Sequence, residues 1–188
     1  MTTDIFAIHG AFSSPRIFNY LKYKLGRSYR WHFLDYSSET SGLATIINSI
    51  TPPKSAHVIG HSMGGLIALA LANQPWVTSV TTISTPIGGV EINAIQSYLT
   101  RSEFIKDVAN HSNFILGFKK LKIQTPTQHL ISVNGFNPWL YEPNDGVVTI
   151  RSQRALSFGE TYDISANHAE IMLEDQTAER LLAFWENH

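Results

Sequence analysis

The stretch that decides the fold of this chain is His57-Val58-Ile59-Gly60-His61-Ser62-Met63-Gly64. Its glycine-x-serine-x-glycine pattern follows an apolar run, and it is typical of a sharp strand-to-helix turn that lifts a serine hydroxyl above a sheet edge. The residues two before and two after this serine must be small, because the backbone nearly touches itself across the turn. Gly60 and Gly64 meet that demand. We therefore expect a strained turn at Ser62.

The flanks of this stretch support that interpretation. The run before it has the length and composition of a buried strand. The leucine- and alanine-rich run after it has those of a buried helix, which ends near Asn73 with Pro75 just beyond. Chance matches to the pattern fall mostly in solvent-exposed loops, so its place between a core strand and a core helix favours the turn.

Strand-like and helix-like runs alternate along most of the chain. Such alternation predicts the α/β class: a mostly parallel sheet of about six strands with helices on both faces. We expect one domain over residues 1–188, large enough to bury a core. The expected strands are 5–8, 31–36, 56–59, 77–83, 128–133 and 160–164, and the expected helices are 15–25, 42–50, 63–73 and 169–186.

Residues 88–122 differ from this alternation. They contain two or three helix-like pieces, no obvious strand and many apolar side chains. One interpretation is an ordinary helical crossover with a core face. The other is a helical excursion that covers the site, whose apolar side chains form an acyl pocket or a lid. Phe114 and Phe118, with Phe12 opposite, are the candidate pocket residues.

Composition narrows the classes of function. The formal net charge is −1, charged residues make up 15% of the chain, and no basic run exceeds Lys119-Lys120. These values argue against a nucleic-acid partner. Cysteine is absent, which excludes a thiol nucleophile and a thiolate metal site. The apolar run near the N-terminus is too short for a signal peptide or a transmembrane segment, so a cytoplasmic location is expected.

A serine hydroxyl becomes a good nucleophile only when a neighbouring base takes its proton. A histidine can do so near neutral pH when an acid fixes its tautomer and stabilises the imidazolium. His168 lies between the last expected strand and the terminal helix, on a loop at the edge where Ser62 is expected. The alternatives are less well placed: His129 lies within a strand, His111 in the 88–122 segment and His188 at the end of the chain.

Asp145 is the candidate for the acid. It lies in an Asn-Asp-Gly turn after the strand that ends near Val133, which places its carboxylate near the strand ends. Such turns are common without a catalytic role. The alternatives are Asp163, which lies inside the last strand and is expected to face solvent, and Asp35, which precedes the nucleophile in the chain.

The tetrahedral intermediate of acyl transfer needs two backbone N–H donors. The His9-Gly10 turn after the first strand leaves the N–H of Ala11 free above the strand ends, and the turn at the serine presents that of Met63. We expect these two groups to form the oxyanion hole, with Phe12 as the second choice for the first donor.

These motifs, in this order, resemble those of small single-domain α/β-hydrolases of the lipase and esterase type, similar to minimal bacterial lipases and to GPI inositol-deacylase-like lipases. The resemblance spans nearly the whole chain and begins on the His-Gly strand, so we expect this chain to lack the first two antiparallel strands of full-size members. It implies a minimal α/β-hydrolase fold. The matching motifs are His9-Gly10-Ala11, 60–65, Ser84-Thr85-Pro86-Ile87-Gly88-Gly89, 144–148 and Asn167-His168.

The resemblance implies hydrolysis of carboxylic esters, whereas the spacing and order of the residues indicate only a Ser-His-Asp acyl-transfer site. We expect an acyl-enzyme mechanism on short to medium acyl chains of a small-molecule or lipid ester. No cofactor is expected, and no carboxylate cluster has the spacing of a metal site. The alternatives are a thioesterase, an amidase or an acyltransferase with the same residues, and a non-catalytic binding module on a hydrolase scaffold. The oligomeric state has no signal in the sequence.

Overall fold

The computed structural model describes residues 3–37, 41–90, 106–118 and 120–188. Their strands form one six-stranded sheet with the order β2-β1-β3-β4-β5-β6, in which every neighbouring pair is parallel. The six expected strands are confirmed, with small shifts at their ends. They are β1 (Thr3–Ile8), β2 (Tyr29–Leu34), β3 (Ala56–His61), β4 (Val77–Ile83), β5 (Thr127–Ser132) and β6 (Glu160–Ile164).

Strand β2 ends earlier than the apolar pattern suggests. Its last residue is Leu34, and the chain then turns so that the Tyr36 ring stacks on the His9 ring with centroids 4.4 Å apart. The Tyr36 hydroxyl also donates a hydrogen bond to the His9 carbonyl over 2.7 Å. Tyr36 therefore leaves the strand to fix the end of β1, beside the loop that holds Ala11.

The helices occupy the positions predicted from the apolar periodicity, with two short additions, η2 and α6, and one break. Helix α6 has only four residues, too few to show a helical period. The expected terminal helix is broken at Glu174, whose backbone is extended (φ −84°, ψ 133°). The helical elements are η1 (Pro15–Phe18), α1 (Asn19–Leu25), η2 (Gly26–Ser28), α2 (Leu43–Asn48), α3 (Met63–Leu71), α5 (Asn113–Phe118), α6 (Ile150–Gln153), η4 (Glu170–Leu173) and α7 (Asp175–Glu186).

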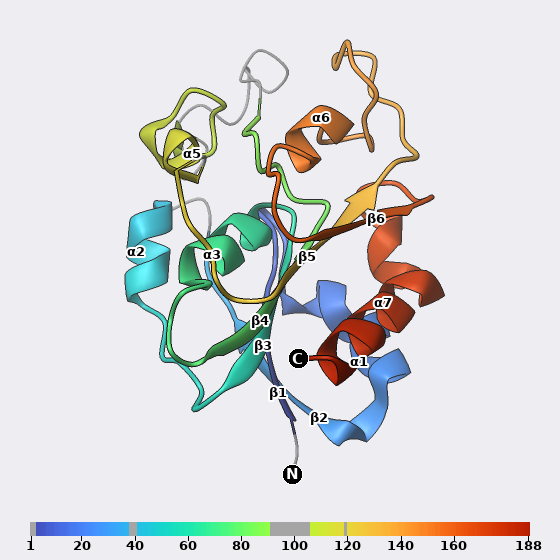
Figure 1. The fold of residues 1–188 in the computed structure, drawn as a ribbon. Helices are drawn as coiled ribbons and strands as arrows, with labels where there is room; N and C mark the ends of the chain where they lie inside the picture. The colour runs from blue at the N-terminus through green and yellow to red at the C-terminus, as the bar shows by residue number, and fades with distance from the viewer. Residues whose placement is uncertain (1–2, 38–40, 91–105, 119) are drawn as a thin grey trace.

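Helices cover both faces of the sheet, as expected for parallel strands. In Figure 1, α1 and α7 lie on one side of the strands, and α2 and α3 lie on the other. Side chains alternate along β1, so that Phe6 and Ile8 join the core under α2 and α3, while Ile5 and Ala7 join the core under α1 and α7. Two apolar cores therefore hold the sheet between its helices.

The described part of the 88–122 segment packs on the first of these cores. Val90 pairs with Ala109 in an isolated parallel bridge, and Ile115 and Phe118 of α5 are buried in the core. This contact is what an ordinary crossover with a core face would show. Residues 91–105 and 119, with Phe104 and Ile105 among them, lie outside the described residues, so the role of the whole segment as a cover stays a prediction.

The parallel sheet gathers the candidate site residues at one edge. Ala11 follows β1, Ser62 follows β3, Asp145 lies in the loop after β5, and His168 follows β6. Figure 1 shows α6 and the loop before it above the ends of these strands, with the start of β1 at the opposite end of the molecule. Ligands of α/β sheets bind outside this carboxyl edge.

Candidate active site

The turn at Ser62 has the strained backbone that its sequence predicts. Ser62 adopts φ 53° and ψ −128°, outside the regions that a residue with a side chain favours, directly between β3 and α3. Its N–H donates to the Ile83 carbonyl of β4 over 2.7 Å. The strain is therefore held in place by the neighbouring strand.

The glycines around this turn are required by close backbone contacts. A Cβ at Gly60 would lie 2.4 Å from the Gly64 carbonyl oxygen, which is the contact across the turn that the sequence predicts. A Cβ at Gly64 would instead lie 2.2 Å from the Ile8 carbonyl oxygen. A glycine is therefore required at position 64 because α3 begins directly against the end of β1, a contact that the sequence pattern does not reveal.

Ser62, His168 and Asp145 lie in one hydrogen-bonded line. The Nε2 atom of His168 is 2.9 Å from Ser62 Oγ, and its Nδ1 atom is 2.7 Å from Asp145 Oδ2. The His168 backbone N–H also donates to the Asp145 carbonyl over 2.9 Å. The structure therefore brings together the three residues selected from the sequence, in the geometry that proton transfer from a serine hydroxyl needs.

The Asp145 side chain is buried, with 1% of its surface exposed, and its first oxygen is bound by its own turn. The Val147 and Val148 N–H groups donate to Oδ1 over 2.9 and 2.7 Å. Burial alone raises the pKa of the Asp145 carboxyl, but hydrogen bonds and the charge of His168 outweigh burial and hold this pKa below its ordinary value. The group is therefore a carboxylate at neutral pH.

The second oxygen of Asp145 accepts two further side-chain hydrogen bonds beside that of His168. Ser132 Oγ, at the end of β5, donates over 2.5 Å, and Gln153 Nε2, on α6, donates over 3.0 Å. Neither residue is predicted from the sequence. Neither stands in a recognisable motif, and α6 is too short to have been expected. Gly135 was also missed: a Cβ there would lie 2.1 Å from the Asp145 carbonyl carbon.

His61, the variable residue of the turn, binds the loop that holds His168. Its Nε2–H donates to the His168 carbonyl over 2.8 Å, and the two rings lie 5.0 Å apart. Burial and the nearby His168 lower the pKa of His61 to about 3. His61 is therefore a neutral hydrogen-bonding residue that links the end of β3 to the end of β6.

The loop after β1 approaches the serine closely. A Cβ at Gly10 would lie 2.9 Å from Ser62 Cβ, so the next residues of this loop lie beside the nucleophile. Phe12 adopts a positive φ of 54°, and half of its side-chain surface is exposed. Met63 is the first residue of α3, where a backbone N–H has no acceptor within the helix. Ala11 and Met63 thus lie beside Ser62 at the carboxyl edge of the sheet, and the oxyanion hole expected at their N–H groups stays a prediction.

The alternative acids contact side chains other than His168. Asp163 is on the exposed side of β6 and pairs with Arg154. The Asp35 side chain is 79% exposed, and its Oδ1 lies 3.7 Å from His9 Nε2.

The alternative histidines are also engaged elsewhere. His129 is buried between Thr82 and the Phe158 carbonyl, and burial lowers its pKa to about 4. His111 contacts Asn110, and His188 packs on Phe184 of α7.

Large apolar side chains are exposed along the loop between β5 and α6. Phe136, Trp139 and Tyr141 are 83%, 73% and 95% exposed, and Val147, two residues after the acid, is half-exposed. The candidate pocket residues of α5 are placed differently. Phe118 is buried in the core, and Phe114 packs against it edge to face with ring centroids 4.9 Å apart.

Neither a metal site nor a membrane span appears in the described ranges. No group of three or more histidine and acidic side chains there could hold a metal ion. Within the same residues, no helix has the length and apolar character needed to cross a bilayer.

Known proteins resemble this chain in part of its sequence and in nearly all of its fold. The Thioesterase domain family matches residues 3–75, which include the His9-Gly10 turn and Ser62 but neither Asp145 nor His168. No curated protein matches the sequence.

Solved structures match over nearly the whole chain. The mature lipase BlEst2 of Bacillus licheniformis superposes with a TM-score of 0.71 at 17% identity, over 97% of this chain and 91% of that one. A lipase-esterase related protein of Clostridium acetobutylicum gives 0.66 at 17% identity, over 97% and 94%. A pyrethroid hydrolase of Sphingobium faniae gives 0.62 at 15% identity, over 99% and 98%. The chain therefore has the α/β-hydrolase fold.

Proposed function

We propose that this protein is a serine hydrolase that cleaves carboxylic esters through an acyl-enzyme. The observation that carries this proposal is the continuous line of hydrogen bonds from Ser62 Oγ through the His168 ring to the buried Asp145 carboxylate. A line of this kind activates a hydroxyl group for attack on an acyl carbon. The lipase and esterase structures that share the fold are consistent with this chemistry.

In the proposed mechanism, Ser62 Oγ attacks the acyl carbon while His168 Nε2 takes its proton. Asp145, hydrogen-bonded to His168 Nδ1, fixes the tautomer that leaves Nε2 free to accept and stabilises the imidazolium that forms. The N–H groups of Ala11 and Met63 hold the negative oxygen of the tetrahedral intermediate. The alcohol leaves with the proton from His168, and water then releases the acyl group by the same steps.

The substrate proposed is an ester with an apolar acyl chain of short to medium length. Its support is the surface around the site, where Phe12, Val147 and the aromatic side chains of the loop before Asp145 are exposed. Exposed apolar side chains at the mouth of a site favour an apolar substrate, because its transfer from water is favourable. No cofactor takes part in this mechanism.

A thioesterase is the second candidate, and one observation favours it: the Thioesterase domain family matches residues 3–75. The proposed chemistry is the same, since a thioester offers the same acyl carbon with a thiolate as leaving group. The two candidates differ only in which leaving group the site accepts best.

Matched substrates test both candidates. Oxygen esters and thioesters of one acyl chain should be compared by kcat/KM on the wild-type protein and on Ser62→Ala. We expect hydrolysis by the wild-type protein and a loss of about 10⁶ in kcat in the variant, the magnitude seen when such a group is removed from a serine protease. Faster turnover of the thioester would support the second candidate. Equal, slow hydrolysis by both proteins would support a non-catalytic binding module.

A further inference from the structure

The Asp145 carboxylate is surrounded entirely by donors. Val147 and Val148 bind Oδ1, whereas His168 Nδ1, Ser132 Oγ and Gln153 Nε2 bind Oδ2. A carboxylate has about four lone-pair positions, so five donors saturate it. Two of the five, Ser132 and Gln153, belong to no backbone turn and no part of the proposed mechanism, and both are buried.

Gln153 is held in one orientation by the backbone of Ser132. Its Oε1 accepts from the Ser132 N–H over 3.1 Å, and its Nε2 donates to the Ser132 carbonyl over 3.2 Å. The same Nε2 has a second hydrogen, which reaches Asp145 Oδ2 over 3.0 Å. The amide therefore extends the hydrogen bonding of β5 sideways onto α6, and its remaining hydrogen is directed at the carboxylate.

The direction of the Ser132 hydroxyl group follows from the number of hydrogens that it and its partners can donate. An ionised carboxylate only accepts, so the single hydroxyl hydrogen of Ser132 must go to Asp145 Oδ2. Ser132 Oγ then accepts the hydroxyl hydrogen of Ser84, which lies 2.7 Å away. Ser84 is fully buried and adopts a positive φ of 50° at the end of β4. A chain of two hydroxyl groups thus runs from β4 through β5 to the acid.

We propose that Gln153 and Ser132 are positioning residues that hold the Asp145 carboxylate in line with His168 Nδ1, with Ser84 orienting the Ser132 hydroxyl behind them. This inference rests on the proposed function, since it assigns a role within the same site. Through Asp145, the two residues keep the His168 ring directed at Ser62. They do not touch the reacting atoms, so their removal should weaken turnover without weakening substrate binding.

Removing either donor should also change the pH dependence. A carboxylate with fewer donated hydrogen bonds binds a proton more tightly and attracts the His168 imidazolium more strongly. The coupled pair then takes up its proton at higher pH. The acidic limb of the kcat/KM profile should therefore move to higher pH, a change that a purely structural role would not cause.

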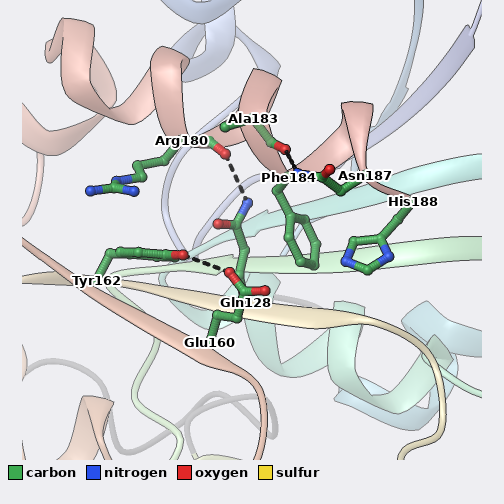
Figure 2. Close-up of a pocket in the computed structure, with 8 residues that line it drawn as sticks. All are labelled: Gln128, Glu160, Tyr162, Arg180, Ala183, Phe184, Asn187 and His188. Carbon is green, nitrogen blue, oxygen red and sulfur yellow. Dashed lines mark hydrogen bonds between the residues drawn. The ribbon is translucent and has the colours of Figure 1, made fainter.

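The chain offers a matched control in Gln128. This residue is also a fully buried glutamine on β5, and its Nε2 donates to Thr81 Oγ1 over 3.0 Å. It lies at the opposite end of the strand from Ser132, where Figure 2 shows it lining a pocket with Arg180 and Tyr162. Replacing either glutamine by methionine keeps the approximate volume and removes the amide. Comparing the two variants therefore distinguishes the effect of losing any buried amide from the effect of losing the amide that contacts Asp145.

The experiment compares Gln153→Met, Gln128→Met and Ser132→Ala with the wild-type protein. For Gln153→Met and Ser132→Ala we expect a decrease of about tenfold in kcat, the size of one hydrogen bond to a charged group. We expect little change in KM and an acidic limb moved by roughly half a pH unit or more. For Gln128→Met we expect a lower unfolding temperature and the wild-type profile.

The proposed positioning has a readout that does not depend on turnover. The proton NMR signal of His168 Nδ1–H lies far downfield when it is bonded to a carboxylate, and its position should change in Gln153→Met and Ser132→Ala. If the wild-type protein showed this signal but hydrolysed no ester, the result would contradict the proposed function and not the positioning role. Unchanged kcat, pH profile and Nδ1–H signal in the two variants would overturn the positioning role. Ser132→Ala, which removes a single oxygen, decides the matter where Gln153→Met does not fold.

Discussion

The turn at Ser62 and the turn at Asp145 lie at the same edge of the sheet, but different forces hold them. At Ser62 the backbone is strained and glycines allow β3, α3 and β1 to approach within contact of one another. At Asp145 five donated hydrogen bonds hold one carboxylate, and three of them come from side chains on other parts of the sheet edge: β5, α6 and the loop after β6. Close packing fixes the nucleophile, and a polar network fixes the acid.

Among the substitutions that compare the two turns, replacing the acid Asp145 should have the largest effect on activity. Asp145→Asn should lower kcat by about 10³ to 10⁴, because the His168 tautomer and its imidazolium lose their support. The amide would also replace an oxygen that accepts from Ser132 and Gln153 by an NH₂ group or turn its oxygen away from His168, so the variant should lose stability. Kinetics and thermal unfolding measure the two effects.

Asp163→Asn is the matched control, since Asp163 is half-exposed and bound to Arg154. It should cost far less than Asp145→Asn in both measurements. The reverse ranking would move the acid to β6.

This difference between the turns also explains what the sequence could predict. Glycines at fixed spacing beside a serine are visible in one short stretch, and apolar periodicity gave the six strands and their helices. Asp145 and His168 could be selected because they follow strands that a parallel sheet brings to one edge. Ser132, Gln153 and Gly135 could not, because the contacts through which they act on Asp145 leave no motif or apolar pattern in the sequence. The interruption at Glu174 and the four-residue α6 were missed because neither leaves an apolar pattern.

Acid should destabilise the protein through its buried histidines. Burial lowers the pKa of His57 and His129 to about 4 and that of His61 to about 3, whereas an unfolded histidine titrates near 6.5. Below pH 6.5 the unfolded state therefore binds protons that the folded state does not. The free energy of unfolding should fall as the pH drops from 6.5 towards 4, by up to about 1.4 kcal/mol per pH unit for each histidine.

Urea unfolding between pH 4 and pH 8 checks this dependence. His129→Gln, which removes one of the three groups, should make the decrease shallower. His111→Gln, at an exposed position, should leave it unchanged. A stability that stays constant from pH 7 to pH 4.5 would show that these histidines are protonated in the folded protein.

The smallest expected effect concerns the substrate. Each buried methylene contributes about 0.8 kcal/mol, so kcat/KM should rise up to fourfold per added carbon until the acyl site is full. A p-nitrophenyl ester series from short to long chains measures where the rise stops. Phe114→Ala should shift that point if α5 lines the acyl site.

Phe118→Ala is a less direct probe of the acyl site, because Phe118 is buried in the core and its loss should also lower stability. A profile that both variants leave unchanged would return α5 to the role of a core crossover.

The central claim is that packing presents Ser62 as a nucleophile and the hydrogen-bonded line through His168 activates it. Intact-protein mass spectrometry after reaction with a fluorophosphonate tests this claim most directly. We expect one adduct on the wild-type protein, mapped to Ser62 after proteolysis, with no adduct on Ser62→Ala and far slower labelling of His168→Ala. Labelling of Ser62→Ala at the wild-type rate, or an adduct mapped to another serine, would contradict it.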